Sequence, residues 1–209
     1  MFLSREEIRR RFPNLIENGD RNLIREVCYG LCVGNEVYRS EDHLPTTLSD
    51  AEPYLILHPG QFALVKTCEK VLVPQDAVAL ISIRFEYKLQ GLVNVSGFHV
   101  DPTFHGYLIF AVQNVGPNDI RLRYREPTFM IMWARLTEPY VPSASDRKRS
   151  GHEHIPVHMM AQLGGGTITL SQLKSEVDKL HTQVKFFAGL VFALLMALIA
   201  VILRPIFQR

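Results

Sequence analysis

The sequence has few of the residues that mark several common classes of protein. It holds three cysteines in 209 residues, Cys28, Cys32 and Cys68, and their spacing offers no pair of the kind that binds zinc. It also lacks a glycine-rich phosphate loop, a nucleophile elbow and the cysteine pair of the zinc-dependent deaminases. We therefore expect the three thiols to be reduced and buried in a cytosolic domain.

An excess of charge of either sign is missing as well. The chain has 23 Lys and Arg against 21 Asp and Glu, and a net charge of +2 is too small to indicate a nucleic-acid partner. Residues 1–11 are too charged to form a secretory signal peptide. His152, His154 and His158 have no cysteine near them in the sequence and lie in a loop, so we predict no metal site.

A long apolar run occurs near the C-terminus, at residues 186–203, which carry no charged side chain. As a helix this run would be about 27 Å long, close to the ~30 Å hydrocarbon core of a bilayer. A buried core helix is the alternative, but such a helix normally has a polar face, and this run has none. We predict a single transmembrane helix at 186–203. Lys174, Lys179 and Lys185 precede it, which favours a single-pass C-terminal anchor with the large domain in the cytoplasm.

A heptad pattern leads into the apolar run. Residues 169–172, Thr-Leu-Ser-Gln, form a capping box, with Ile168 and Leu173 placed as its hydrophobic staple. Apolar residues then alternate at spacings of three and four, at Leu170, Leu173, Val177, Leu180, Val184 and Phe187. We predict an amphipathic stalk helix over 168–185 that associates copies of the chain as a coiled coil. Gly189, Ala193 and Ala197 would let the helices approach closely in lipid.

The N-terminal part of the chain carries short strand patterns separated by turn residues. A capping box at Ser4-Arg-Glu-Glu7 predicts a helix from about Arg5 to Arg11. We then expect short strands around Gly30 and Gly34, a loop at 41–53, and strands at 54–58, 61–67, 77–83, 92–95, 107–113, 120–124 and 128–136. This pattern predicts an all-β sandwich, jelly roll or barrel over residues 1–140. An arm and Gly-rich linker at 141–167 would come next.

Residues 91–116 form the most specific pattern in the chain, a strand, a tight polar turn and a second strand. Gly97 and Gly106 bracket the turn, where a side chain would block a close approach of the backbone. Pro102 forces Asp101 into an extended conformation and cannot donate to a sheet. A buried Asp101 could bind or activate a ligand, or it could tie the turn together by accepting backbone N–H bonds. The residues by themselves leave both interpretations open.

This hairpin resembles the core motif of the dCTP deaminase and dUTPase superfamily. Residues 98–106, Phe-His-Val-Asp-Pro-Thr-Phe-His-Gly, are similar to its uracil- or cytosine-binding hairpin, and the likeness runs from about Tyr54 to Leu136. The resemblance implies a dUTPase-like jelly roll or β-barrel, a homotrimer with pockets at subunit contacts, and a pyrimidine deoxynucleotide ligand that could bring Mg²⁺. The nucleotide-binding residues that it implies are Arg84, Ser96, Gly97, Phe98, His99, Asp101, Phe104 and Gln113. Arg147, Lys148 and Arg149 would contact the phosphates, or they would form a solvated run of charge.

The sequence departs from the family at two places. dCTP deaminases have a catalytic glutamate in the strand after the hairpin, and the matching residue here is Ala111, which cannot carry a proton. Glu86 could supply a carboxylate from another position, and Asp101 is the other catalytic candidate. Phe85 and Glu86 also replace two serines that contact phosphates, and Glu86 would repel a triphosphate. Arg84 would then contact an anion or pair with Glu86 or Asp101.

These observations lead to three hypotheses. The first is a membrane-anchored nucleotide-binding protein that has lost deaminase activity and acts as a nucleotide sensor or effector. The second is an active dCTP deaminase or dUTP pyrophosphatase that is tethered to the membrane and depends on Asp101. The third is a scaffold with no ligand, in which the β domain serves only to form the trimer.

Overall fold

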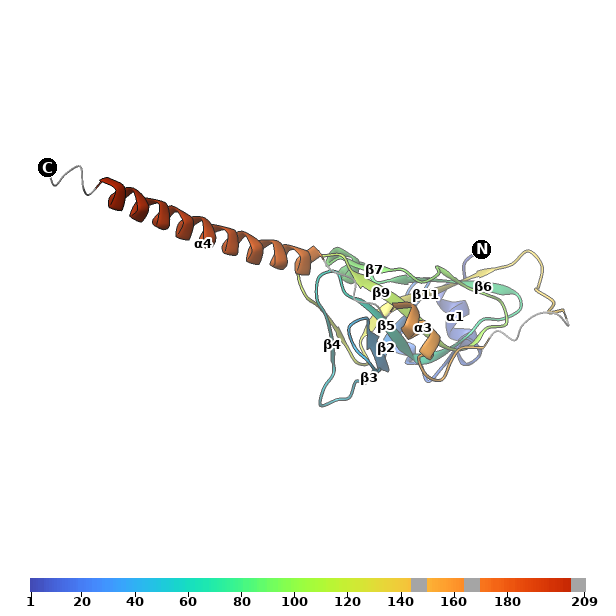
Figure 1. The fold of residues 1–209 in the computed structure, drawn as a ribbon. Coiled ribbons are helices and arrows are strands. Elements are labelled where there is room, and N and C mark those ends of the chain that lie inside the picture. Colours follow the sequence, from blue (N-terminus) through green and yellow to red (C-terminus); the bar gives the residue numbers. More distant parts are fainter. Residues whose placement is uncertain (144–149, 164–169, 204–209) are drawn as a thin grey trace. The chain divides into compact units, whose positions relative to one another are not determined.

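The structure is a computed structural model that describes residues 1–143, 150–163 and 170–203 (Figure 1). The chain divides into two compact units, Met1–Thr167 and Ile168–Arg209. The first, called the β unit below, consists mainly of strands that form a curled sheet, as the sequence predicts. In the second unit the described residues form one helix, α4 (Leu170–Leu203).

The strands of the β unit range from two to 11 residues and pair antiparallel. Their bounds are β1 (Ile16–Glu17), β2 (Tyr29–Arg39), β3 (Thr46–Thr47), β4 (Tyr54–Leu57), β5 (Phe62–Leu72), β6 (Ala77–Ile83), β7 (Leu92–Asn94), β8 (His99–Val100), β9 (His105–Asn114), β10 (Ile120–Arg123) and β11 (Pro127–Arg135). The main sheet has the order β7-β9-β5-β2-β11-β6-β8, with β1 beside β5 and β3 beside β2. Strands β4 and β10 pair separately.

The core lies inside the curl of this sheet. Side chains along β9 alternate between buried and half-buried, because successive residues of a strand point to opposite faces. Phe110 of β9 stacks on Phe129 of β11 with ring centroids 3.9 Å apart, and Trp133 is fully buried. The opposite face of β9 carries Tyr107 and Ile109, and this outer face borders the candidate site.

Several predicted elements are confirmed with close bounds. Helix α1 spans Arg5–Arg11, and the Ser4 side chain accepts a hydrogen bond from the Glu7 N–H, as the capping box predicts. Strand β6 has the predicted bounds. The prediction of short strands around Gly30 and Gly34 is wrong, because β2 is one strand of 11 residues. The predicted loop at 41–53 contains the two-residue strand β3.

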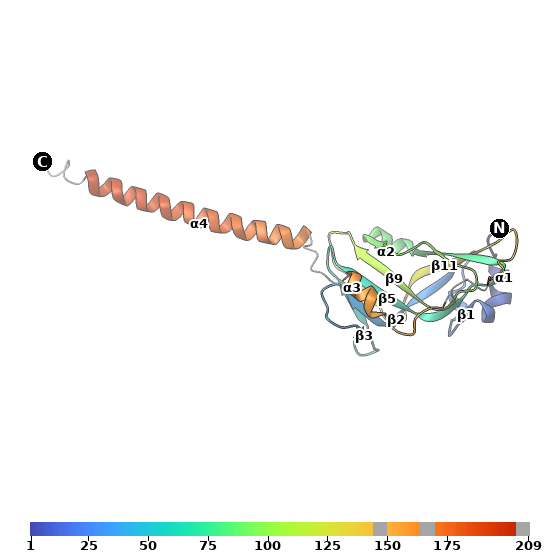
Figure 2. The same ribbon diagram turned by 45° about the vertical axis from the view of Figure 1, so that its right-hand side comes forward.

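Two helices of the β unit were not predicted. Helix α2 (Phe85–Leu89) follows β6, and helix α3 (Val157–Leu163) lies in the segment that the sequence indicates as an arm and linker. Residues 150–163, called the strap below, pack on the β unit, and α3 lies against β5 in both views (Figures 1 and 2). The arm is therefore an ordered part of this unit over these residues.

Helix α4 contains a candidate membrane span. Among the described residues, the 22-residue stretch Ser175–Met196 is long and apolar enough to cross a bilayer. This stretch overlaps the predicted span at 186–203. The heptad residues Leu173, Val177, Leu180, Val184 and Phe187 are each at least half exposed in the single chain. The capping box at 169–172 lies partly outside the described residues, and the coiled coil stays a prediction.

Candidate functional site

The turn between β8 and β9 is tight and hydrogen-bonded, and it belongs to the predicted hairpin, whose paired strands are β7 and β9. Phe104 N–H donates to the Asp101 carbonyl, and the turn is tied to β5's end by Thr103 N–H to Val73 O at 2.8 Å. Thr103 adopts a positive φ of 69°, which few non-glycine residues do. On the approach to β8, the Asn94 side chain donates to Gly97 O and accepts from Ser96 N–H. The turn is thus rigid on both sides.

A hollow of about 370 Å³ lies beside this turn. This volume is within the range of small-molecule pockets, roughly 300–1,000 Å³. The predicted residues Ser96, Gly97, His99, Asp101 and Phe104 all line it. The structure adds Ile81, Val100, Leu108, Ile109 and Ser150 to the lining. Of these, Ser150 comes from the strap, so the hollow is completed by a segment that is distant in sequence.

Two expectations about the turn are wrong. Asp101 is not buried: its side chain is 49% exposed, and its Oδ1 lies 3.6 Å from Nε2 of His99. Gly97 does not mark a close approach, because a Cβ built there would meet no atom within 4 Å. Gly106 does: it has φ +147°, and its Cβ would lie 2.6 Å from the backbone of Gly151. Close packing occurs where the strap crosses the hairpin.

The other predicted site residues lie away from the hollow's lining. Arg84 Nη2 pairs with Glu86 Oε1 at 2.5 Å, and its Nη1 donates to Pro127 O. Of the alternatives left open for Arg84, the structure therefore shows the salt bridge with Glu86. Gln113 donates to Gly60 O at 3.3 Å. Phe98 is exposed and its ring lies against that of His99, with centroids 4.9 Å apart.

Ala111, the position of the family's glutamate, belongs to an apolar cluster on the outer face of the sheet. Ala111 of β9 is the cross-strand partner of Leu64 on β5, which in turn pairs with Tyr38 on β2. Ile155 of the strap is buried against Tyr38 and Leu64. The strap residues Met159, Met160 and Leu163 pack on the same cluster. The surface around position 111 is therefore apolar and shared with the strap.

A buried ion pair holds the strap by its backbone. Lys66 Nζ lies 2.8 Å from Glu36 Oε2, and the two side chains are only 8% and 13% exposed. Lys66 also donates to Glu153 O at 2.7 Å, and Glu36 accepts the Ile155 N–H at 2.8 Å. No local pattern in the sequence indicates this pair, because Glu36 and Lys66 are 30 positions apart.

Among the described residues that line the hollow there is neither a thiol nor a metal-binding cluster. Among the described residues no cluster of three His, Cys, Asp or Glu could hold a metal ion. The predicted phosphate-binding residues Arg147, Lys148 and Arg149 lie outside the described residues. The cysteines are free, but only Cys32 is buried, so the prediction that all three are buried is wrong. Burial raises the pKa of Cys68 to about 11, which keeps that thiol protonated at neutral pH.

The glycines of the hairpin offer a matched test of this geometry. Replacing Gly106 with alanine is expected to lower the free energy of unfolding by about 1–3 kcal/mol, because the new Cβ would meet Gly151 in an unfavourable φ region. Gly97→Ala should change it by less than about 0.5 kcal/mol. Denaturant unfolding of both variants measures the difference, and equal effects would contradict the close approach.

Comparisons with known proteins agree with this fold. The model of the dCTP deaminase-like family matches residues 2–136. The dUMP-forming dCTP deaminase of Methanothermobacter thermautotrophicus is 31% identical over 125 residues, which cover 52% of this chain and 64% of that protein. The dCTP deaminase of Thermococcus sibiricus is 29% identical over 139 residues, covering 66% and 85%. A crystal structure of the deaminase from Agrobacterium tumefaciens matches with a TM-score of 0.54 at 15% identity, covering 63% of this chain and 48% of that one.

These matches cover only parts of the chains that are compared. The chain spans less than two thirds of the length of the Methanothermobacter protein, so the activity of that whole protein is not carried over. The structural match at 15% identity supports the fold alone. The family match, however, covers more than half of the 209 residues, including the hairpin. The chain therefore belongs to the dCTP deaminase-like family.

Proposed function

We propose that this chain is a membrane-anchored nucleotide-binding protein that has lost deaminase activity and acts as a nucleotide sensor or effector. The ligand would be a pyrimidine deoxynucleotide held at the turn between β8 and β9. The β unit would lie in the cytoplasm, anchored through the apolar part of α4. Copies of the chain would associate as a trimer through the β unit and the heptad residues of α4.

The hollow at the hairpin supports nucleotide binding. Its volume of about 370 Å³ suits a small organic ligand. Its lining combines apolar walls, such as Phe104 and Ile109, with polar groups at Ser96 and His99. The relatives of known activity are named for dCTP, a pyrimidine deoxynucleotide. Because the described residues offer no metal-binding cluster, any Mg²⁺ would be held mainly by the phosphates of the ligand.

The surroundings of Ala111 carry the proposal that deamination is lost. Deamination without a metal needs a carboxylate that moves protons between water and the base. Position 111 holds alanine in an apolar cluster with Ile155 and the methionines of α3. Among the described residues that line the hollow, Asp101 is the only carboxylate, and it is half exposed. Glu86 does not line the hollow and is paired with Arg84.

The direct test measures binding and turnover on the same preparation. We expect the purified full chain in detergent to bind dCTP or dUTP in calorimetry and to release neither ammonia nor pyrophosphate over many turnovers. Loss of a general acid or base typically lowers a rate by ~10²–10⁴-fold. Multiple-turnover release of either product would contradict the proposal and favour the tethered enzyme.

A variant in the hollow supplies the control. Gly97→Phe places a ring beside the hollow at a position where a Cβ meets no atom within 4 Å, so the fold should be kept. We expect this variant to lose nucleotide binding, and Val115→Phe, at an exposed position outside the lining, to keep it. Failure of every nucleotide to bind the wild type would instead support the scaffold hypothesis.

A further inference from the structure

A second cavity, of about 580 Å³, opens on the β unit and shares no lining residue with the hairpin hollow. It lies where β5 loses register with both of its neighbours. The pairing of β5 with β2 shifts between Val33 and Val37, and its pairing with β9 shifts between Lys66 and Lys70. The regular ladder is interrupted at this double irregularity, and Lys66, Thr67, Cys68 and Glu69 of β5 line the cavity there.

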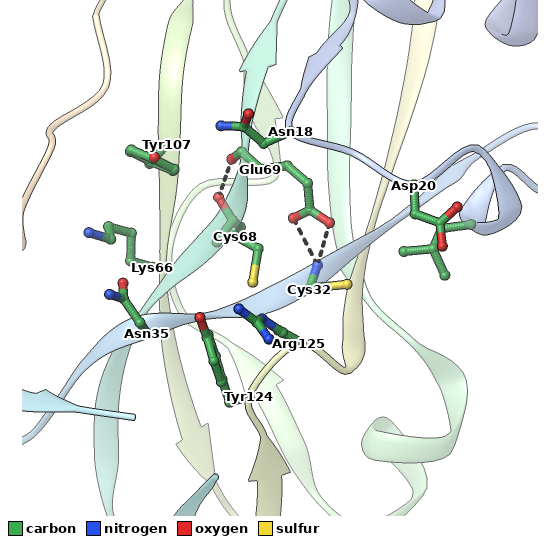
Figure 3. Close-up of a pocket in the computed structure, with 12 residues that line it drawn as sticks. Asn18, Asp20, Cys32, Asn35, Lys66, Cys68, Glu69, Tyr107, Tyr124 and Arg125 are labelled. Atoms are coloured by element: carbon green, nitrogen blue, oxygen red, sulfur yellow. Dashed lines mark hydrogen bonds between the residues drawn. The ribbon is translucent and has the colours of Figure 1, made fainter. Parts of the chain in front are cut away.

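The cavity is lined by polar side chains, of which some, such as Lys66 and Glu69, are bonded within the protein. Figure 3 shows Tyr107 and Asn18 on one side of the space and Tyr124 and Arg125 on the other. Within the described part of the chain, the Tyr107 and Tyr124 hydroxyls and the side-chain amides of Asn18 and Asn35 have no hydrogen-bond partner. These groups can donate to or accept from the hydroxyls of a bound molecule.

The backbone at the cavity is held in an unusual conformation. Three described non-glycine residues have a positive φ, and two of them, Asn18 at 59° and Arg125 at 62°, line this cavity. Asparagine tolerates this region, but arginine does so rarely. The conformation of Arg125 is fixed by its N–H, which donates to Val33 O at 2.9 Å. Such strained positions concentrate at binding sites, where the surrounding structure maintains them.

The cavity is lined by two cations, Lys66 and Arg125, and by two carboxylates, Asp20 and Glu69. Lys66 is already paired with Glu36, so Arg125 is the cation open to an anion. Glu69 is 2% exposed, and its carboxylate already accepts from Cys32 N–H and Tyr29 O–H. Burial raises the pKa of Glu69. The guanidinium of Arg125 lies over the Tyr124 ring, 4.8 Å from its centroid, and its ion pair is a long one of 3.4 Å with the exposed Asp50. A pair of this kind contributes little and is easily exchanged for a ligand.

We propose that this cavity is a second ligand site, which binds a small oxyanion that carries hydroxyl groups, such as a sugar phosphate. Arg125 binds the oxyanion through its guanidinium fork. The side chains of Asn35, Tyr107 and Tyr124 form hydrogen bonds with the hydroxyl groups of the ligand. This site is independent of the nucleotide proposed for the hairpin.

The test uses ribose 5-phosphate, with ribose and inorganic phosphate as separate probes, on the full chain in detergent by calorimetry. We expect ribose 5-phosphate to bind more tightly than either part. Arg125→Gly should weaken binding by roughly 10- to 100-fold, the effect of losing one charge-assisted hydrogen bond. Its melting temperature should not fall, because glycine adopts a φ of about +60° without strain. A loss of binding without a loss of stability separates a ligand contact from a structural role.

Two controls fix the location of the site. Arg121→Ala removes a charge from an exposed residue of β10 outside the cavity and should bind ribose 5-phosphate like the wild type. Gly97→Phe should also bind it like the wild type, because the hairpin hollow is a different site. The proposal is overturned if the wild type does not bind ribose 5-phosphate, if Arg125→Gly binds it unchanged, or if either control loses binding.

Discussion

Replacement of Lys66 with methionine is expected to lower the free energy of unfolding of the β unit by about 3–5 kcal/mol. Methionine keeps most of the apolar stem of lysine but removes the charge, so among the described residues Glu36 keeps only the exposed His154 imidazole and the Ile155 N–H as partners. Breaking a buried ion pair from one side costs this much because the remaining charge is uncompensated. The backbone carbonyl of Glu153 loses its hydrogen bond at the same time. The strap should therefore detach before the sheet unfolds.

The measurement combines denaturant unfolding with hydrogen exchange of the strap. In the wild type the Ile155 amide donates to Glu36, so its exchange reports directly on docking, and it should become faster in Lys66→Met. Lys88→Met serves as the matched control, because Lys88 is exposed and contacts only Ser82 through its ammonium group among the described residues. It should change the free energy of unfolding by no more than about 0.5 kcal/mol. Equal effects of the two substitutions would refute the role of the Glu36–Lys66 pair.

The stabilisation by the Glu36–Lys66 pair depends on pH, so the pH at which Lys66→Met is compared with the wild type matters. Burial would raise the pKa of Glu36, but hydrogen bonds from Lys66 and from Ile155 N–H outweigh it, so the folded-state pKa is lowered. A lowered pKa means that this stabilisation is present above the ordinary value of about 4.3 and is lost as the pH falls through the folded-state value. The full difference between Lys66→Met and the wild type is therefore expected near pH 7, and it should shrink in acid.

Local sequence patterns predicted those elements whose determinants lie close together in the chain. The capping box at Ser4 sets the start of α1, and Pro13 follows its end. The bounds of β6 follow from its short apolar run between turn residues. The hairpin could be placed because proline restricts the backbone, whereas glycine permits a positive φ, as at Gly106, that residues with a Cβ rarely adopt.

Elements that depend on distant contacts could not be predicted in this way. The strap has a polar, proline-containing sequence, and Lys66 and Glu36 hold it from 87 and 119 positions away. Helix α2 is only five residues long, too short to show a helical period. Asp101 was expected to be buried because it lies between apolar strands, yet the turn carries it to the surface. The exposure of a side chain in a turn depends on which distant segments pack over the turn, and the local sequence does not indicate these segments.

At position 111 the family resemblance and the structure each explain part of the sequence. The resemblance identified alanine where the family has glutamate, which indicates a lost proton carrier. The structure adds that Ala111 lies in a row with Leu64 and Tyr38, on which the strap packs. A small apolar residue at 111 is thus compatible with the docked strap. Where the resemblance implies a carboxylate, this chain has an apolar contact.

Replacing Ala111 with glutamate is expected to detach the strap without restoring deamination. The new carboxylate would enter a cluster that contains Ile155, Met159 and Met160. An ionised carboxylate among apolar side chains costs several kcal/mol unless it is paired. The described residues of this cluster offer no cation, so undocking of the strap is the less costly outcome. Exchange of the Ile155 amide should become faster, and ammonia release from dCTP should stay at background.

Ala111→Gln is the matched control, because glutamine has the same shape without the charge. It should disturb the strap less than glutamate at pH 7, and the two variants should converge below a pH of about 4.3, where glutamate becomes neutral. If Ala111→Glu kept the strap docked and released ammonia over many turnovers, the hollow would retain all other requirements for deamination. The loss of activity would then rest on this single residue, and the apolar cluster would play no part in it.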